Sequence, residues 1–312
     1  MQLQIDVSQN ILQQFATQLS SIADITENVL KVRPAFGEGT FTFEAFPNQL
    51  ELYHLVSYSK LEMGIHSQNP ADSEWLLYNI NLSNQAIEKT VNNQEVNIQK
   101  YLPSGILIYT PQTQVFSSSP AHTHFEIALV RFHRSFLAQY LYQELPILAN
   151  TDRAVIYEDL DYYLEKSLNN ALQTSNKINA HAHLLSFMGG VIEKLQQRST
   201  EESFEDLHPN DLKGLFTASA YLRNPLASSI PSINDLAEIA GMGVTKFKTT
   251  FKQVFGAPPI QYHRKIKLEY ARQELVSQRK TATELSYELG YSHPSKFTIA
   301  YKKQFGIVPS QT

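Results

Sequence analysis

Two spacings of apolar residues divide the chain into three stretches. In the first, residues 1–133, apolar positions alternate with polar ones or form short runs, which predicts β-strands. Clusters of turn-forming residues separate these runs, a pattern that favours a sandwich or barrel. The first 20 residues fit a helix or a strand, and the pattern does not separate the two. The predicted strands are Phe41–Phe46, Leu50–Leu55, Trp75–Leu82, Ile106–Tyr109 and His124–Phe132.

The second stretch, residues 134–208, changes to the three- and four-residue spacing of amphipathic helices. We predict a short helix from Phe136 to Leu141, a second from Tyr157 to Leu168 and a long one from Ile178 to Leu195. The chain is therefore predicted to be an α+β multidomain protein. Its parts are a β-rich domain (1–133), a helical linker or dimerisation region (134–208) and an all-α C-terminal domain (209–312).

The third stretch, residues 209–312, contains an internal repeat. The segment from Leu236 to Gly241 resembles Leu285 to Gly290, and the segment from Phe247 to Gly256 resembles Phe297 to Gly306. The copies lie 49 or 50 residues apart, and prolines follow each of them. A repeat of this length indicates two copies of one supersecondary unit.

Each copy predicts two short helices joined by a tight turn. A hydroxyl residue followed three positions later by a carboxylate, Ser232 with Asp235 or Thr281 with Glu284, is typical of a helix N-terminus. Glycine then ends the first helix, where the backbone needs a positive φ. The second helix carries aromatic residues every fourth position, so one face points inward and the polar, basic face points outward. Together these features describe a helix-turn-helix.

One long helix from Pro259 to Ser277 is predicted between the copies, which fixes their separation. Two recognition helices about one DNA turn apart, roughly 34 Å, can enter successive segments of the major groove. The other faces of the connecting helix offer cations for phosphate contacts: Arg264, Lys265, Lys267 and Arg272.

Charge separates the third stretch from the rest of the chain. Residues 1–210 carry 12 basic and 23 acidic side chains, whereas residues 211–312 carry 14 basic and seven acidic ones, a net charge of +7. A basic end on an acidic body points to a polyanion at that end only. The alternative, an all-α bundle with solvated lysines, does not explain why the lysines are duplicated in register.

Other compositional features exclude several classes of site. The chain has no cysteine, which removes disulfides, cysteine zinc sites and thiol nucleophiles and fits a reducing compartment. No apolar run approaches the ~18–20 residues of a membrane span. Residues 1–20 carry no Lys or Arg, so we expect no secretory signal and a cytoplasmic protein.

Residues 212–312 resemble the DNA-binding domain of the AraC/XylS-type transcription regulators, most clearly in Gly290-Tyr291-Ser292 and in the run from Phe297 to Pro309. The resemblance implies two helix-turn-helix subdomains linked by a helix. Ile299 departs from the family pattern, in which Arg is common, and Gly243 stands where Ser or Thr often caps the first recognition helix. By position, the base-facing residues are Thr245, Lys248, Thr249, His293, Ser295, Lys296 and Thr298, and the flanking phosphate contacts add Lys246, Lys252 and Lys302.

For the first domain the resemblance implies a cupin-like barrel that binds an effector, dimerises or both. His122, His124 and Glu126 alternate, which predicts that all three share one face of a strand. Two imidazoles with a carboxylate could ligate a divalent metal there. The spacing does not match the cupin ligand pattern, so a polar strand face or a turn is the preferred interpretation. We expect no metal, no cofactor and no catalysis; no effector-binding residue is assigned.

The sequence thus predicts a sequence-specific, double-stranded-DNA-binding regulator that responds to a small molecule, forms a homodimer and acts on RNA polymerase. Two alternatives stay open. One is a constitutive dimeric regulator whose first domain only dimerises, and the other is a cupin-type metal enzyme with a DNA-binding tail.

Overall fold

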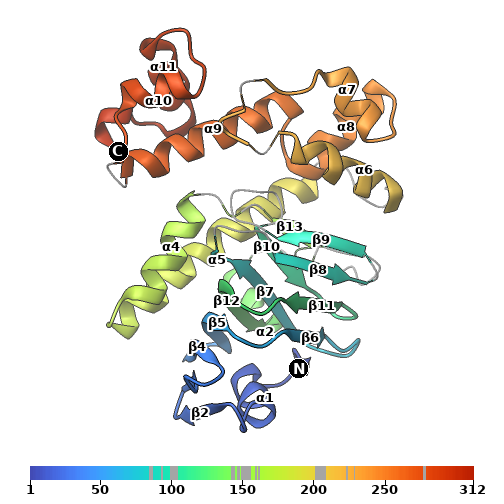
Figure 1. Cartoon of the computed structure of the whole chain (residues 1–312), viewed down its shortest axis with the longest axis vertical. Coiled ribbons are helices and arrows are strands. Elements are labelled where there is room, and N and C mark those ends of the chain that lie inside the picture. Colours follow the sequence, from blue (N-terminus) through green and yellow to red (C-terminus); the bar gives the residue numbers. More distant parts are fainter. Residues whose placement is uncertain are drawn as a thin grey trace. The chain divides into compact units, whose positions relative to one another are not determined.

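A computed structural model describes residues 1–83, 87–92, 94–98, 105–141, 145, 148, 156–158, 160, 162–200, 209–222, 224–227, 229–276 and 279–312. The chain forms two compact units, Met1–Ser199 and Thr200–Thr312 (Figure 1). The β-rich part and the all-α part follow each other in the predicted order, which confirms the predicted fold class. Within the described ranges, no helix combines the length and the apolar character of a membrane span.

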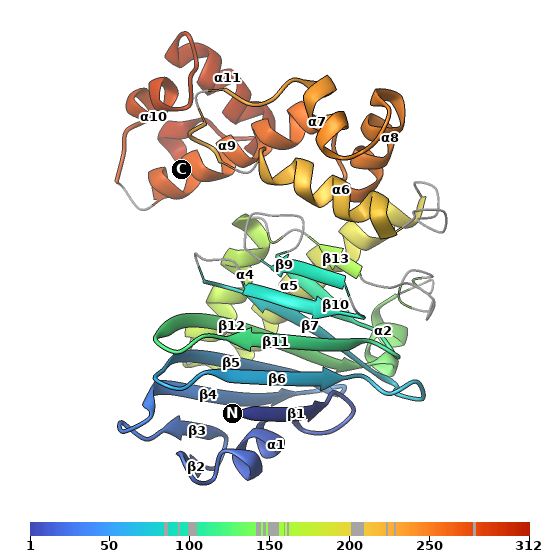
Figure 2. The ribbon, with the colours of Figure 1, turned by 45° about the vertical axis from the view of Figure 1, so that its right-hand side comes forward.

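Two sheets form the body of the first unit (Figure 2). The five-stranded sheet has the order β1-β6-β11-β8-β9, and the eight-stranded sheet has the order β13-β10-β7-β12-β5-β4-β3-β2. The strands of the first are β1 (Gln2–Asp6), β6 (Met63–Gln68), β11 (Gln114–Ser119), β8 (Ile87–Val91) and β9 (Gln94–Ile98). The strands of the second are β13 (Ile156–Glu158), β10 (Ile106–Tyr109), β7 (Trp75–Asn81), β12 (Thr123–His133), β5 (Leu50–Ser59), β4 (Gly37–Phe46), β3 (Val29–Val32) and β2 (Ala23–Thr26).

The central strands of the eight-stranded sheet are buried on both faces, which explains the continuous apolar run of β7. One set of its side chains, including Leu77 and Tyr109, packs with the five-stranded sheet and with helix α1 (Ile11–Gln18). The opposite set, including Tyr78 and Val130, packs against three helices. These helices are α2 (Arg134–Tyr140), α4 (Tyr162–Gln173) and α5 (Lys177–Thr200).

Two sequence predictions for this unit change. The start of the chain contains both elements, since strand β1 is followed by helix α1. The helix predicted from Tyr157 begins only at Tyr162, and that prediction was wrong at its start: Tyr157 belongs to the short strand β13, which pairs with β10 in the register Leu107–Tyr157. A three-residue edge strand is too short for a periodic pattern, so the helical spacing beyond it dominated the prediction.

The second unit contains two small apolar cores on one shared helix. Helix α9 (Pro259–Val276) agrees with the predicted connector (Figure 1). Its first half, with Tyr262 and Ile266, packs in a core with α6 (Pro209–Ala220), α7 (Ile233–Ile239) and α8 (Val244–Phe255). Its second half, with Leu268 and Ala271, packs in a core with α10 (Ala282–Glu288) and α11 (Pro294–Phe305). A short 3-10 turn, Pro309–Gln311, follows α11.

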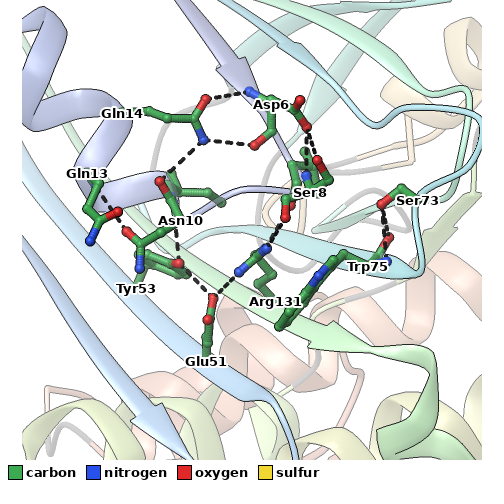
Figure 3. Close-up of polar contacts among 12 residues, drawn as sticks. Asp6, Ser8, Asn10, Gln13, Gln14, Glu51, Tyr53, Ser73, Trp75 and Arg131 are labelled. Carbon is green, nitrogen blue, oxygen red and sulfur yellow. Dashed lines mark hydrogen bonds and ion pairs between the residues drawn. The ribbon is translucent and has the colours of Figure 1, made fainter.

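A buried polar network fastens β1 and α1 to the eight-stranded sheet (Figure 3). Arg131 of β12 is 3% exposed; its Nε donates to Val7 O at 2.7 Å and its Nη2 to Ser8 O at 2.6 Å. Its Nη1 pairs with the Glu51 carboxylate at 2.5 Å, which also accepts from the Tyr53 hydroxyl at 2.7 Å. The guanidinium carbon lies 3.6 Å from the centre of the Trp75 ring.

Replacing Arg131 by Met should therefore destabilise the first unit by about 3–5 kcal/mol, because the Glu51 carboxylate would remain buried without its cation. Denaturant unfolding followed by circular dichroism measures this loss. As the control, Arg33→Met removes the exposed ion pair of Arg33 with Asp24, at 2.7 Å, and should cost less than about 1 kcal/mol. Equal losses in the two variants would contradict the assigned role of Arg131.

Candidate functional site

The two halves of the second unit begin with the same helix cap. The Ser232 hydroxyl accepts from the Asp235 amide at 3.2 Å, and the Asp235 carboxylate accepts from the Ser232 amide at 3.0 Å. Thr281 and Glu284 repeat this arrangement at 3.2 and 2.7 Å. Both N-termini are thus closed by capping boxes, as the sequence predicted.

The turns that follow are also alike. Gly241 and Gly290 have φ angles of +68° and +78°, which other residues adopt only with strain. One residue later, the Met242 amide donates to Ala237 O and the Tyr291 amide to Ser286 O, both at 2.9 Å. These bonds satisfy carbonyl groups at the end of the first helix and turn the chain into the second one.

Aromatic stripes orient the second helices, α8 and α11. In α8, the rings of Phe247, Phe251 and Phe255 follow one another at centroid distances of 5.3 and 4.3 Å. In α11, Phe297, Tyr301 and Phe305 do so at 5.6 and 4.6 Å. All six residues are buried. Because each stripe faces a core, the opposite face of each helix must face outward.

The predicted base-facing residues lie on those outward faces. Six of them are exposed, and Thr298 is half-buried and donates its hydroxyl to Pro294 O at 3.0 Å. Thr249 likewise donates to Thr245 O, at 3.1 Å, within its helix. The exposed six are Thr245, Lys248, Thr249, His293, Ser295 and Lys296.

The two second helices start differently. At the start of α11 the His293 Nδ1 accepts from the Ser295 amide at 3.2 Å, and Pro294 occupies the first helical position. The corresponding residue of α8, Gly243, makes no side-chain cap bond. His293 therefore caps the N-terminus of α11. The sequence prediction placed His293 at the start of this helix but missed the capping role, which the His-Pro-Ser order could have indicated.

The predicted phosphate contacts fall into two groups. Lys252, Arg264 and Lys302 are exposed, and Lys265 is half-buried. For the others the structure gives specific contacts within the unit. Lys246 is exposed but pairs with Asp211 at 2.7 Å, and the Lys267 ammonium donates to Leu289 O at 3.1 Å at the end of α10. Desolvation lowers the pKa of Lys267.

Arg272 is the least exposed of the predicted phosphate contacts. It is 7% exposed, and its guanidinium carbon lies 4.6 Å from the centre of the Phe305 ring. Its position joins α9 to the aromatic stripe of α11, which is a packing role.

Ile299 is an exposed apolar side chain within the outward face of α11. It is 69% exposed and lies three and four residues after Lys296 and Ser295, so it shares their side of the helix.

The candidate metal ligands of the first unit contact other side chains. His122 precedes strand β12, has a φ of +61° and lies 3.1 Å from the Tyr58 hydroxyl through Nδ1. His124 stacks on the Tyr58 ring at 4.4 Å, and the Glu126 carboxylate lies 2.8 Å from His54 Nε2. The expectation that all three share one strand face is therefore wrong for His122. In the part of the chain that the structure describes, no group of three such ligands surrounds a common point.

A cavity of about 390 Å³ lies between the two sheets of the first unit. Apolar side chains from both sheets and from α1 form most of its wall, and its volume falls within the ~300–1,000 Å³ typical of ligand pockets. Representative wall residues are Phe15, Phe41, Leu77, Tyr109, Phe125 and Leu129. The sequence prediction assigned no effector-binding residue, and this cavity supplies the candidates.

Lys89 brings a cation into this wall. It is 5% exposed, its ammonium donates to the Ser117 hydroxyl at 2.8 Å, and burial lowers its pKa to about 8. Its place could have been found from the sequence: in β8, Ile87, Lys89 and Val91 alternate with polar residues, which puts the lysine on the apolar face.

Comparisons with known proteins concern mainly the second unit. A helix-turn-helix domain model matches residues 236–312. The chain is 32% identical over 80 residues to the HTH-type transcriptional regulator ExsA of Pseudomonas aeruginosa (26% of this chain, 29% of ExsA). It is 34% identical over 79 residues to the virulence regulon transcriptional activator VirF of Yersinia enterocolitica (25% of this chain, 29% of VirF). The chain thus spans less than a third of the length of these curated relatives.

Two solved structures are also similar to parts of the chain. A transcriptional regulator with an AraC-type DNA-binding domain, from Chromobacterium violaceum, is 25% identical with a TM-score of 0.30, covering 33% of this chain and 92% of that one. ToxT from Vibrio cholerae is 12% identical with a TM-score of 0.34, covering 84% of this chain and 97% of ToxT.

Replacing Lys89 by Met should stabilise the ligand-free chain at pH 7. The folded pKa of about 8 lies below the unfolded value of ~10.4, so the unfolded chain binds more protons between these values. The charge on Lys89 therefore opposes folding below pH 8, by about 3 kcal/mol, and this penalty fades as the pH rises toward ~10.4.

Unfolding experiments at pH 7 and pH 10 measure the difference in the free energy of unfolding between the Lys89→Met chain and the wild type. Groups that titrate alike in both chains cancel in this difference. The gain from Lys89→Met should be large at pH 7 and small at pH 10. The control Lys31→Met changes an exposed lysine of β3 and should alter neither value. A Lys89→Met chain that is less stable than the wild type at pH 7 would contradict this prediction.

Proposed function

Because residues 236–312 form an AraC-type helix-turn-helix domain, we propose that the whole protein is a cytoplasmic, sequence-specific regulator of transcription that binds double-stranded DNA. The observation that carries the proposal is the matched pair of outward, polar and basic helix faces on α8 and α11. Each face is fixed by a buried aromatic stripe, and one helix, α9, connects the two helix pairs of the second unit.

The exposed residues on these faces have the chemistry of direct base readout. Lysine donates to guanine, hydroxyl groups bond to either purine edge, and Thr and Ile offer apolar contacts to the thymine methyl group. In α8 these residues are Thr245, Lys248 and Thr249, and in α11 they are Ser295, Lys296 and the added Ile299. We place His293 and Thr298 beside them as supporting residues at the start of α11.

Phosphate contacts position a protein on the duplex without reading its sequence. Among the described cations, Lys252, Arg264 and Lys302 have the exposure for this role, and Lys265 is half-buried. Lys246 can join them if it exchanges Asp211 for a phosphate. Arg272 and Lys267 have packing and capping roles, so the proposal leaves them out.

The first unit supplies the effector site in this proposal, because it contains a cavity of ligand size with a mainly apolar wall. This favours an effector-responsive regulator over a constitutive one. The proposal further includes a homodimer and a contact with RNA polymerase, both of which rest on the family resemblance.

Lys248→Ala tests base readout. Its exposed position in the middle of α8 predicts a contact with a base edge, so the variant should lose about 1–3 kcal/mol of discrimination between cognate and scrambled DNA. The cognate site is first selected from a random duplex pool with the wild-type chain, and affinities for both duplexes are then measured by mobility shift. If selection enriches no site, the proposed function is wrong; if the variant weakens both duplexes equally, Lys248 is not a base reader.

Lys302→Ala tests phosphate positioning. Lys302 is exposed in the last turn of α11, so its loss should weaken cognate and scrambled DNA alike and reduce the slope of log affinity against log salt by about 1. Titrations at several salt concentrations measure both effects. Lys31→Ala, a change of equal charge in the first unit, serves as the control and should leave the slope unchanged; a loss for Lys302→Ala confined to the cognate duplex would contradict the assignment.

A further inference from the structure

The cavity of the first unit holds a buried cation that faces apolar walls. Lys89 and Ser117 are directly paired across β8 and β11, so their side chains share the face that lines the cavity. Ser117 in turn pairs with Ile65 of β6, another wall residue. The ammonium is therefore held at a fixed place in the wall by the register of three strands.

This cation lacks a partner of opposite charge among the described residues. Its one polar contact there is the neutral Ser117 hydroxyl. Glu88 also borders the cavity, but it is exposed and adjacent to Lys89 in the strand, so it points to the opposite face. Arg131, another buried cation of the first unit, is paired with Glu51. Buried charges in proteins are normally paired, and Lys89 departs from this rule at the wall of a cavity.

Two more polar atoms of the wall are unsatisfied. Asn79 Oδ1 and Ser119 Oγ are buried and have no hydrogen-bond partner. Asn79 uses its amide nitrogen to donate to the Tyr109 hydroxyl at 3.4 Å, which leaves its oxygen as an acceptor. Buried polar atoms left in this way indicate that a polar group is expected beside them.

We propose that the cavity binds a small organic acid, whose carboxylate pairs with the Lys89 ammonium and the Ser117 hydroxyl and whose apolar body fills the space between the sheets. A carboxylate supplies the missing negative charge and accepts from both groups. The apolar wall selects a hydrocarbon or aromatic body, and a single cation suits a monoacid better than a polyanion. A hydroxyl on that body would donate to Asn79 Oδ1. This inference rests on the proposed function only in making the acid the effector.

Calorimetry with matched probes tests the class of ligand. The full chain is titrated with decanoate and 1-decanol, and with benzoate and benzyl alcohol, so that each pair differs in the charged group alone. At least one acid should bind, at least about 10-fold more tightly than its alcohol. An alcohol that binds as well as its acid would overturn the proposal, and so would the failure of both acids to bind at millimolar concentration.

Variants assign the site. Lys89→Met should weaken the acid by about 10- to 100-fold while leaving the alcohol nearly unchanged, and Ser117→Ala should weaken the acid by a smaller factor. Since Lys89→Met is expected to fold more stably, a loss of binding cannot be attributed to unfolding, and circular dichroism verifies this. The control Lys31→Met should bind as the wild type does. Unchanged acid binding by Lys89→Met would overturn the assignment.

A mobility shift with the selected duplex separates this inference from the proposed function. A chain that binds DNA but neither acid overturns the ligand class and leaves the DNA-binding role intact. A chain that binds an acid through Lys89 but enriches no DNA site overturns the regulator and leaves the acid site intact. An acid that binds through Lys89 and also changes the affinity for DNA supports both.

Discussion

The packing of aromatic side chains four residues apart determines which side chains the second unit presents to solvent. Once Phe251 and Tyr301 are fully buried, the rotation of α8 and α11 about their own axes is fixed to within a fraction of a turn. The residues that remain outside are then set by the 3.6-residue period alone. The positive-φ glycines before each helix and the shared helix α9 add the remaining constraints, the angle between the paired helices and the distance between the pairs. Binding chemistry therefore depends on residues that never touch the ligand.

In the first unit the corresponding constraint is the alternation of side chains along strands that are buried on both faces. In β7, Leu77 and Asn79 face the cavity while Leu76 and Tyr78 face the helices, so one strand serves two cores. Such a strand leaves no solvent-facing position to a polar residue. A polar side chain on the cavity face, such as Asn79, is then retained at a cost in desolvation, which is the pattern expected of a binding site.

Local signals predicted the second unit well because its elements are defined by neighbours in sequence. Capping boxes, helix-ending glycines and aromatic stripes all lie within ten residues of the feature they specify. Because of the internal repeat, each of these features occurs twice in the sequence. The first unit depends on pairings between distant strands. The short strand β13 owes its conformation to β10, about 50 residues earlier, and no local periodicity records that. The exposure of six of the predicted base-facing residues followed from the aromatic stripes. The burial of Arg272 and the capping by His293 depend on packing that one sequence does not display.

A small molecule changes DNA binding only if it favours one arrangement of the chain over another. Strands β7, β10 and β12 line the cavity with one face and pack against α4 and α5 with the other. In β12, for example, Leu129 lines the cavity and the next residue, Val130, packs with the helices. Filling the cavity therefore acts on the same backbone that supports α5, the helix that ends where the first unit ends. Packed layers tend to shift between discrete arrangements rather than deform continuously, so a ligand that favours one packing of this sheet also favours one packing of the helices on it. Under the proposed function, this shared sheet is therefore the first element on which a ligand in the cavity acts.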